Sequence, residues 1–127
     1  MTLPKLALTV GDPSGIGPEI VVKALRDPRV VDACRPVISG PYEPQDLEAF
    51  PAGRVSADWA TVACEAITRA TQDALAGKVD AIVTAPINKT ALAAAGLPWR
   101  GHTDFLAHLC GTKQVAMMFW SERLRVV

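Results

Sequence analysis

The stretch KLALTVGDPSGIGPEI, residues 5–20, joins an apolar run to a turn and then to the start of a helix. Residues 5–10 are typical of a short buried strand, and Gly-Asp-Pro ends it. Pro18 suits the first turn of a helix, where its missing N–H leaves no hydrogen bond unmade. Glu19 favours the same helix start through the helix dipole. A strand, a turn and a helix in this order indicate an α/β protein.

The turn inside this stretch contains three glycines, Gly11, Gly15 and Gly17. Glycine lets another group come close to the main chain. The spacing, G-x-x-x-G-x-G, matches neither the dinucleotide fingerprint G-x-G-x-x-G nor the phosphate loop G-x-x-x-x-G-K-[ST]. The two common nucleotide-binding loops therefore do not explain the turn. Two hypotheses stay open, a loop that faces a ligand and a tight turn with a purely structural role.

Strand and helix signals alternate through the rest of the chain. Apolar residues recur at helical spacing over 59–74, with Ser56 as the expected N-cap and Gly77 as the residue that ends the helix. The alternation predicts an α/β fold with a mostly parallel sheet flanked by helices. We expect helices over 18–26, 88–95 and 104–109, strands over 37–39, 80–85, 114–120 and 124–127, and a loop over 40–55.

Length and composition limit the kinds of protein that this chain can be. The 127 residues suffice for one domain at most, and half of them are apolar, which favours a packed core. Thirteen basic residues balance thirteen acidic ones, so nothing indicates nucleic-acid binding. No apolar run approaches the roughly 20 residues of a membrane span. The N-terminus lacks signal-peptide features, and the three scattered cysteines (Cys34, Cys64 and Cys110) fit buried or partly buried thiols, so we expect a cytoplasmic protein.

Polar residues follow the predicted strands in three loops, at Asp12, at Asn88 and Lys89, and around His102. Ligands of open α/β sheets bind beyond the carboxyl ends of the strands, so we expect these loops to converge there. A lysine in such a loop can hold a phosphate or a carboxylate, and a histidine can donate a hydrogen bond or carry a proton. For both Lys89 and His102, the alternative hypothesis is a purely structural role. His108 does not share a helix face with His102, which makes the pair a poor metal site.

Four collinear stretches together resemble one enzyme family. They are LALTVGDPSGIGPEI (6–20), DAIVTAPINK (80–89), AGLPWRGHTDFLA (95–107) and QVAMMFWSERLRVV (114–127). They are similar to motifs of the 4-hydroxythreonine-4-phosphate dehydrogenases of vitamin B6 biosynthesis, with Asp104 where the family usually has Glu. The four motifs in this order are strongly specific for the family.

This resemblance implies a partial isocitrate/isopropylmalate-dehydrogenase-like fold, a homodimer, and NAD with a divalent metal (Zn²⁺, Mg²⁺ or Co²⁺) as cofactors. The implied reaction oxidises 4-phosphooxy-threonine at C3, followed by decarboxylation, in pyridoxal phosphate synthesis. The substrate contacts of the family fall on His102 and Thr103. Candidate cleft residues are Asp12, Gly15, Gly17, Asn88, Lys89 and Asp104.

Two departures from the family pattern shape the expectations for this chain. The segment over 40–55 is shorter than usual, and the family's metal-binding histidines lie beyond Val127. We therefore expect residues 1–127 to form a single truncated α/β domain, with no metal ligands or catalytic residues of its own. Such a chain should be inactive alone and should expose an aggregation-prone final strand. Two other hypotheses stay open, a non-catalytic remnant or fragment and a sister dehydrogenase for threonate or erythronate phosphate.

Overall fold

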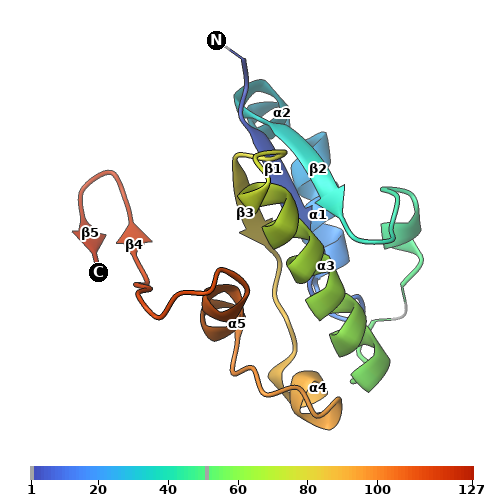
Figure 1. The fold of residues 1–127 in the computed structure, drawn as a ribbon. Helices are drawn as coiled ribbons and strands as arrows, with labels where there is room; N and C mark the ends of the chain where they lie inside the picture. Colours follow the sequence, from blue (N-terminus) through green and yellow to red (C-terminus); the bar gives the residue numbers. More distant parts are fainter. Residues whose placement is uncertain (1, 51) are drawn as a thin grey trace.

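A three-stranded parallel sheet lies at the centre of the fold (Figure 1). The computed structural model describes residues 2–50 and 52–127. Strands β1 (Lys5–Thr9), β2 (Arg35–Ser39) and β3 (Ala81–Thr84) lie in the order β2-β1-β3. The first strand of the sequence is thus the middle strand of the sheet, and it is the most buried of the three. The α/β fold with a parallel sheet is confirmed.

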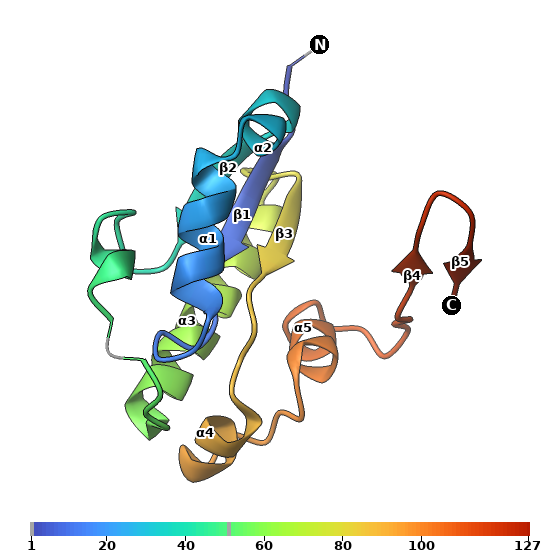
Figure 2. The same cartoon turned by 180° about the vertical axis from the view of Figure 1, so that it is seen from behind.

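Helices cover the two faces of this sheet (Figures 1 and 2). Helix α1 (Gly17–Arg26) packs on the face where Leu8 points, and helix α3 (Ala57–Leu75) packs on the face where Ala7 points. Neighbouring residues of a strand point to opposite faces, which places their side chains in different clusters. The helices flanking the sheet are those predicted from the 18–26 and 56–77 segments.

Helix α3 lies close to the sheet because its buried stripe consists mainly of small side chains. The stripe contains Ala60, Ala63, Ala66, Ile67 and Ala70, none of them more than 4% exposed. Ser56 occupies the N-cap position as predicted, but its side chain makes no capping hydrogen bond.

The structure differs from the sequence prediction at α2, at η1 and at the start of α5. A second short helix, α2 (Pro28–Ala33), starts where the first was expected to stop, and the Asp27 carboxylate caps it by accepting from the Arg29 amide. The 40–55 segment contains a 3-10 turn, η1 (Asp46–Glu48). Helix α4 (Lys89–Ala94) falls within its predicted range, whereas α5 (His102–Leu109) begins two residues before its predicted start.

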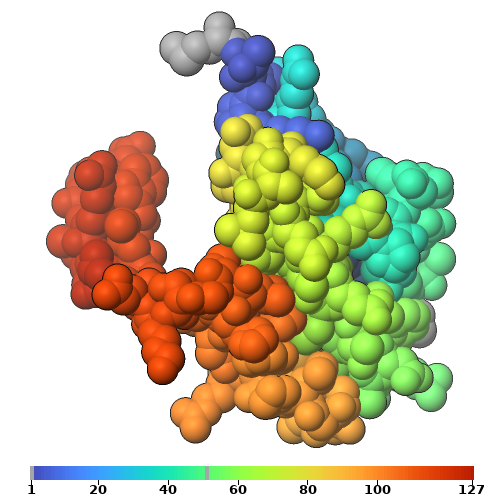
Figure 3. All heavy atoms as spheres, in the orientation of Figure 1, coloured from blue at the N-terminus to red at the C-terminus, as the bar shows by residue number. Residues whose placement is uncertain are grey.

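The last residues form an arm that stands apart from the sheet (Figure 3). We call residues 111–127 the C-terminal arm; all of them are exposed. The predicted strand over 114–120 is wrong in extent, since only β4 (Phe119–Trp120) forms and pairs antiparallel with β5 (Arg125–Val126). The apolar residues of the arm have no covering layer in the described part of the chain, and Trp120 is 63% exposed.

The three cysteines differ in exposure. Cys34 and Cys64 are buried as expected, but Cys110 is exposed, at the end of α5. Burial raises the pKa of the Cys64 thiol.

None of the helices described is both long and apolar enough to span a bilayer.

Candidate active-site edge

The loop after β1 and the loop after β3 are joined by their backbones. The amide of Asp12 donates to the Pro86 carbonyl at 2.9 Å. Gly11 has a φ of +74°, and a Cβ at this position would collide with the same carbonyl oxygen. A Cβ at Gly17 would likewise collide with the Val10 carbonyl. Two of the three glycines of the turn therefore permit close approach between parts of the chain itself.

Asp12 and Ser14 lie inside this turn, each 5% exposed. The Asp12 carboxylate accepts from the Ser14 amide and hydroxyl, both at 2.9 Å. The Ser14 hydroxyl also lies within hydrogen-bonding distance of the Arg54 carbonyl, so its one hydrogen has two acceptors within reach. The Asp12 carboxylate thus holds the turn together, and Ser14 connects the turn to the segment around Arg54.

His102 lies at the start of α5, against Ala85 at the end of β3. Its ring nitrogen Nε2 is buried and has no hydrogen-bond partner in the described chain. Burial lowers the pKa of His102 below its ordinary value of 6.5, and an interaction with the Ala85 backbone opposes this effect only in part. Buried polar atoms are normally paired, so an unpaired nitrogen in a neutral imidazole is available for a ligand.

The residues after His102 differ in what they can offer a ligand. Thr103 is exposed. The Asp104 carboxylate accepts from the amides of Arg100 (2.6 Å) and Gly101 (3.0 Å). The Arg100 amide contributes most to lowering the pKa of Asp104. This carboxylate therefore closes the loop before α5.

Asn88 and Lys89 lie at the start of α4. The Asn88 side chain caps the helix by accepting from the Ala91 amide at 3.0 Å. Lys89 is exposed, and it forms no ion pair with any other described residue. Of the two, Lys89 is the residue with a group free to meet an anion.

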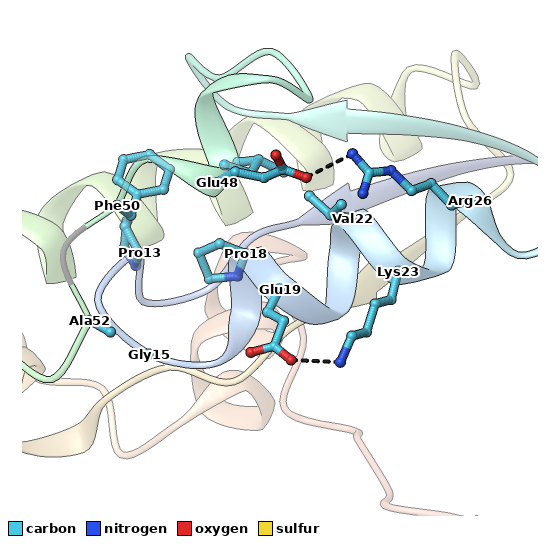
Figure 4. Close-up of a pocket in the computed structure, with 11 residues that line it drawn as sticks. Pro13, Gly15, Pro18, Glu19, Val22, Lys23, Arg26, Glu48, Phe50 and Ala52 are labelled. Atoms are coloured by element: carbon cyan, nitrogen blue, oxygen red, sulfur yellow. Dashed lines mark hydrogen bonds and ion pairs between the residues drawn. The ribbon is translucent and has the colours of Figure 1, made fainter.

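Gly15 faces a different hollow, between α1 and a segment that contributes Leu47, Glu48, Phe50 and Ala52 (Figure 4). This hollow has a volume of about 410 Å³. Its charged groups pair with one another, Lys23 with Glu19 at 2.6 Å and Arg26 with Glu48 at 2.7 Å. His102 does not line it. The structure thus brings Asp12 and His102 to the end of β3, but it places Gly15 in another hollow.

The described residues do not fit the divalent metal that the family resemblance implies. No three His, Cys, Asp or Glu side chains come together there as a metal-binding group. His108 packs on the ring of Trp99, with centroids 4.6 Å apart.

Sequence reasoning missed Thr9. Its hydroxyl is fully buried and lacks a partner, at the end of β1 and beside Thr84 of β3 in the register. The signal was present in the sequence, because a threonine ends an otherwise apolar strand just ahead of the turn.

Comparison with known proteins gives consistent matches. The family model described as pyridoxal phosphate biosynthetic protein PdxA matches residues 18–127. A D-threonate 4-phosphate dehydrogenase of Cupriavidus necator is 35% identical, and the match covers 98% of this chain and 48% of that protein. A 4-hydroxythreonine-4-phosphate dehydrogenase of Desulfosudis oleivorans is 36% identical, with 98% and 47% covered.

A solved structure agrees with these relatives. The crystal structure of a 4-hydroxythreonine-4-phosphate dehydrogenase from Burkholderia phymatum matches with a TM-score of 0.89 and 33% identity, over 98% of this chain and 49% of that one. The chain spans about half the length of the relatives it matches. The aligned stretch with the Cupriavidus necator protein is 161 positions long, which exceeds the 127 residues of this chain, so that relative carries residues that this chain lacks.

Proposed function

The chain belongs to the family of the pyridoxal phosphate biosynthetic protein PdxA, and on that premise we propose that it supplies part of the substrate-binding edge of a dehydrogenase. The proposed substrate is a 4-phosphorylated hydroxy acid, either 4-phosphooxy-threonine or D-threonate 4-phosphate. Relatives named for each substrate match this chain to a similar degree. NAD, for redox chemistry, and a divalent metal, as a Lewis acid, are cofactors of the proposed assembled enzyme, and residues outside this chain would hold the metal. Homodimer formation and a cytoplasmic location belong to the same proposal.

His102 carries the proposal, because its buried Nε2 lacks a partner at the sheet edge where α/β proteins bind ligands. A neutral imidazole can donate a hydrogen bond to a substrate carboxylate or accept one from a hydroxyl. The exposed Thr103 hydroxyl lies next to it in the chain, and the free Lys89 ammonium follows the loop after β3. The chain's own part in the reaction is therefore to bind and orient the substrate.

The test uses the two histidines of the chain, which give separate imidazole signals in NMR spectra. We expect 4-phosphooxy-threonine or D-threonate 4-phosphate to shift the His102 signals saturably and to leave those of His108 in place. His102→Ala should weaken binding by about tenfold, equivalent to one lost hydrogen bond of about 1.4 kcal/mol, whereas His108→Ala should not. Saturable binding that spares the His102 signals would overturn the proposal.

A further inference from the structure

Strand β3 is an edge strand of the sheet with apolar residues left open. It pairs with β1 along one side only, in the described part of the chain. Val83 is 47% exposed. Parallel sheets are normally covered on both faces, and an open apolar edge invites pairing with another strand. This edge therefore lacks the neighbours that a parallel sheet needs.

An apolar hollow continues this open edge onto the α1 face. Helix α1 lies alongside β3 without covering it (Figure 2). The hollow, of about 190 Å³, is lined mainly by apolar groups, among them Leu8, Ala24, Val83 and Pro86. Ile20 at its border is 42% exposed.

The C-terminal arm presents a second apolar surface across an open space from β3 (Figure 3). Met117, Met118, Phe119, Trp120 and Leu124 are each between 59% and 70% exposed. The hairpin of the arm has only two residues in each strand. A two-stranded hairpin alone is marginally stable in water, so the arm needs a partner to hold its form.

We propose that the β3 edge and the C-terminal arm form one docking surface for a polypeptide homologous to the second half of the chain's relatives. The proposal rests on the family membership behind the proposed function. The match to the Burkholderia phymatum structure covers 98% of this chain but 49% of that one. A segment as long as this chain is thus available in that relative to fill the space between β3 and the arm. The occupant adds a strand to β3 and covers Val83 and Phe119.

The experiment co-expresses the full 127-residue chain with the second half of the Burkholderia phymatum relative. We expect an equimolar complex in size-exclusion chromatography with light scattering. Amide hydrogen exchange should slow by about tenfold or more at residues 81–86 and 115–126 on complex formation. Exchange in β2, on the opposite edge, should stay unchanged.

Matched variants locate the surface. Val83→Asp and Phe119→Asp each place a charge where apolar contact is expected, and each should lower the yield of complex by about tenfold. Val37→Asp makes the same change on β2, where Val37 is 39% exposed, and should keep the wild-type yield. A variant can fail to fold, so the far-UV circular dichroism spectrum of each free variant is first compared with that of the wild-type chain. The hydrogen-exchange measurement on the wild-type complex tests the proposal without any variant.

Three results would overturn the proposal. They are two soluble halves that stay separate, a complex whose exchange at 81–86 and 115–126 equals that of the free chain, and a stable dimer of this chain that the second half does not displace. A second half that is insoluble while the first half stays soluble is scored as two halves that stay separate. A protected complex that fails to turn over substrate leaves the docking surface intact and contradicts the proposed function instead.

Discussion

Burial of the His102 imidazole couples folding to protonation. The ring lies against Ala85, its Nε2 is buried, and its pKa is lowered from the ordinary value of 6.5. The unfolded chain therefore takes up a proton at a higher pH than the folded chain does. The contribution to stability is present above 6.5 and is lost as the pH falls below it.

We accordingly expect His102→Gln to change the pH dependence of unfolding. Wild-type stability should decline more than that of the variant as the pH falls from about 7.5 to about 5. Urea unfolding at both pH values, followed by circular dichroism, measures the difference. Equal declines in the two proteins would show that His102 titrates alike in the folded and unfolded chains.

Gly11 combines a left-handed backbone with a crowded position, and Gly96 has the same backbone without the crowding. Their φ values are +74° and +69°, but no atom lies within 4 Å of a Cβ built on Gly96. Gly96→Ala should cost about 1 kcal/mol from the backbone alone. Gly11→Ala should cost at least about 3 kcal/mol, because the Pro86 carbonyl must also move. Chemical denaturation of the two variants tests this, and similar losses would contradict the crowding.

At the level of elements, two helix N-caps differ in how they act: Ser56, which was predicted, and Asn88, which was not. Asn88 accepts a hydrogen bond from the Ala91 amide, whereas Ser56 makes none from its side chain. Asn88→Ala should therefore lower the free energy of unfolding by about 1 kcal/mol. Ser56→Ala should change it by less than about 0.5 kcal/mol. A loss at Ser56 as large as that at Asn88 would show a cap that the structure lacks.

Sequence patterns predicted the elements whose signals are local. The α3 stripe has a helical period, and Gly-Asp-Pro marks the end of the first strand, so these elements were found. Helix α2 was missed because Pro28 both ends one helix and suits the first turn of the next. The strand over 114–120 was overpredicted because its apolar run signals burial, while the covering layer is not part of the described chain.

For the candidate site, the sequence predicted where two loops lie but not what each side chain does. Loops after parallel strands meet at one edge, which predicted Asp12 and His102 near the end of β3. The use of each group depends on tertiary hydrogen bonds that no local pattern encodes. The Asp12 and Asp104 carboxylates hold their own loops, and the Thr9 hydroxyl is left without a partner.

At the level of the whole molecule, the described residues offer a divalent cation few ligands. No three metal-ligating side chains gather in the described chain. We expect the 127-residue protein alone to bind Zn²⁺ and Mg²⁺ weakly, because hard cations need several ligands at once. It should also give no turnover of NAD with 4-phosphooxy-threonine. Calorimetry and NADH absorbance measure the two. Turnover that is abolished by His102→Ala would show that this half suffices.

The place of β1 in the sheet has a consequence for synthesis on the ribosome. β1 is made first, yet its pairing with β3 joins Leu6 to Ala81, which lies 75 residues later. Translation adds roughly 5–20 residues per second, so β1 waits for on the order of 4–15 seconds before β3 exists. During that interval an apolar segment lacks one of its two neighbours. Nascent chains arrested at increasing lengths should therefore gain protease resistance in one late step, after β3 leaves the exit tunnel.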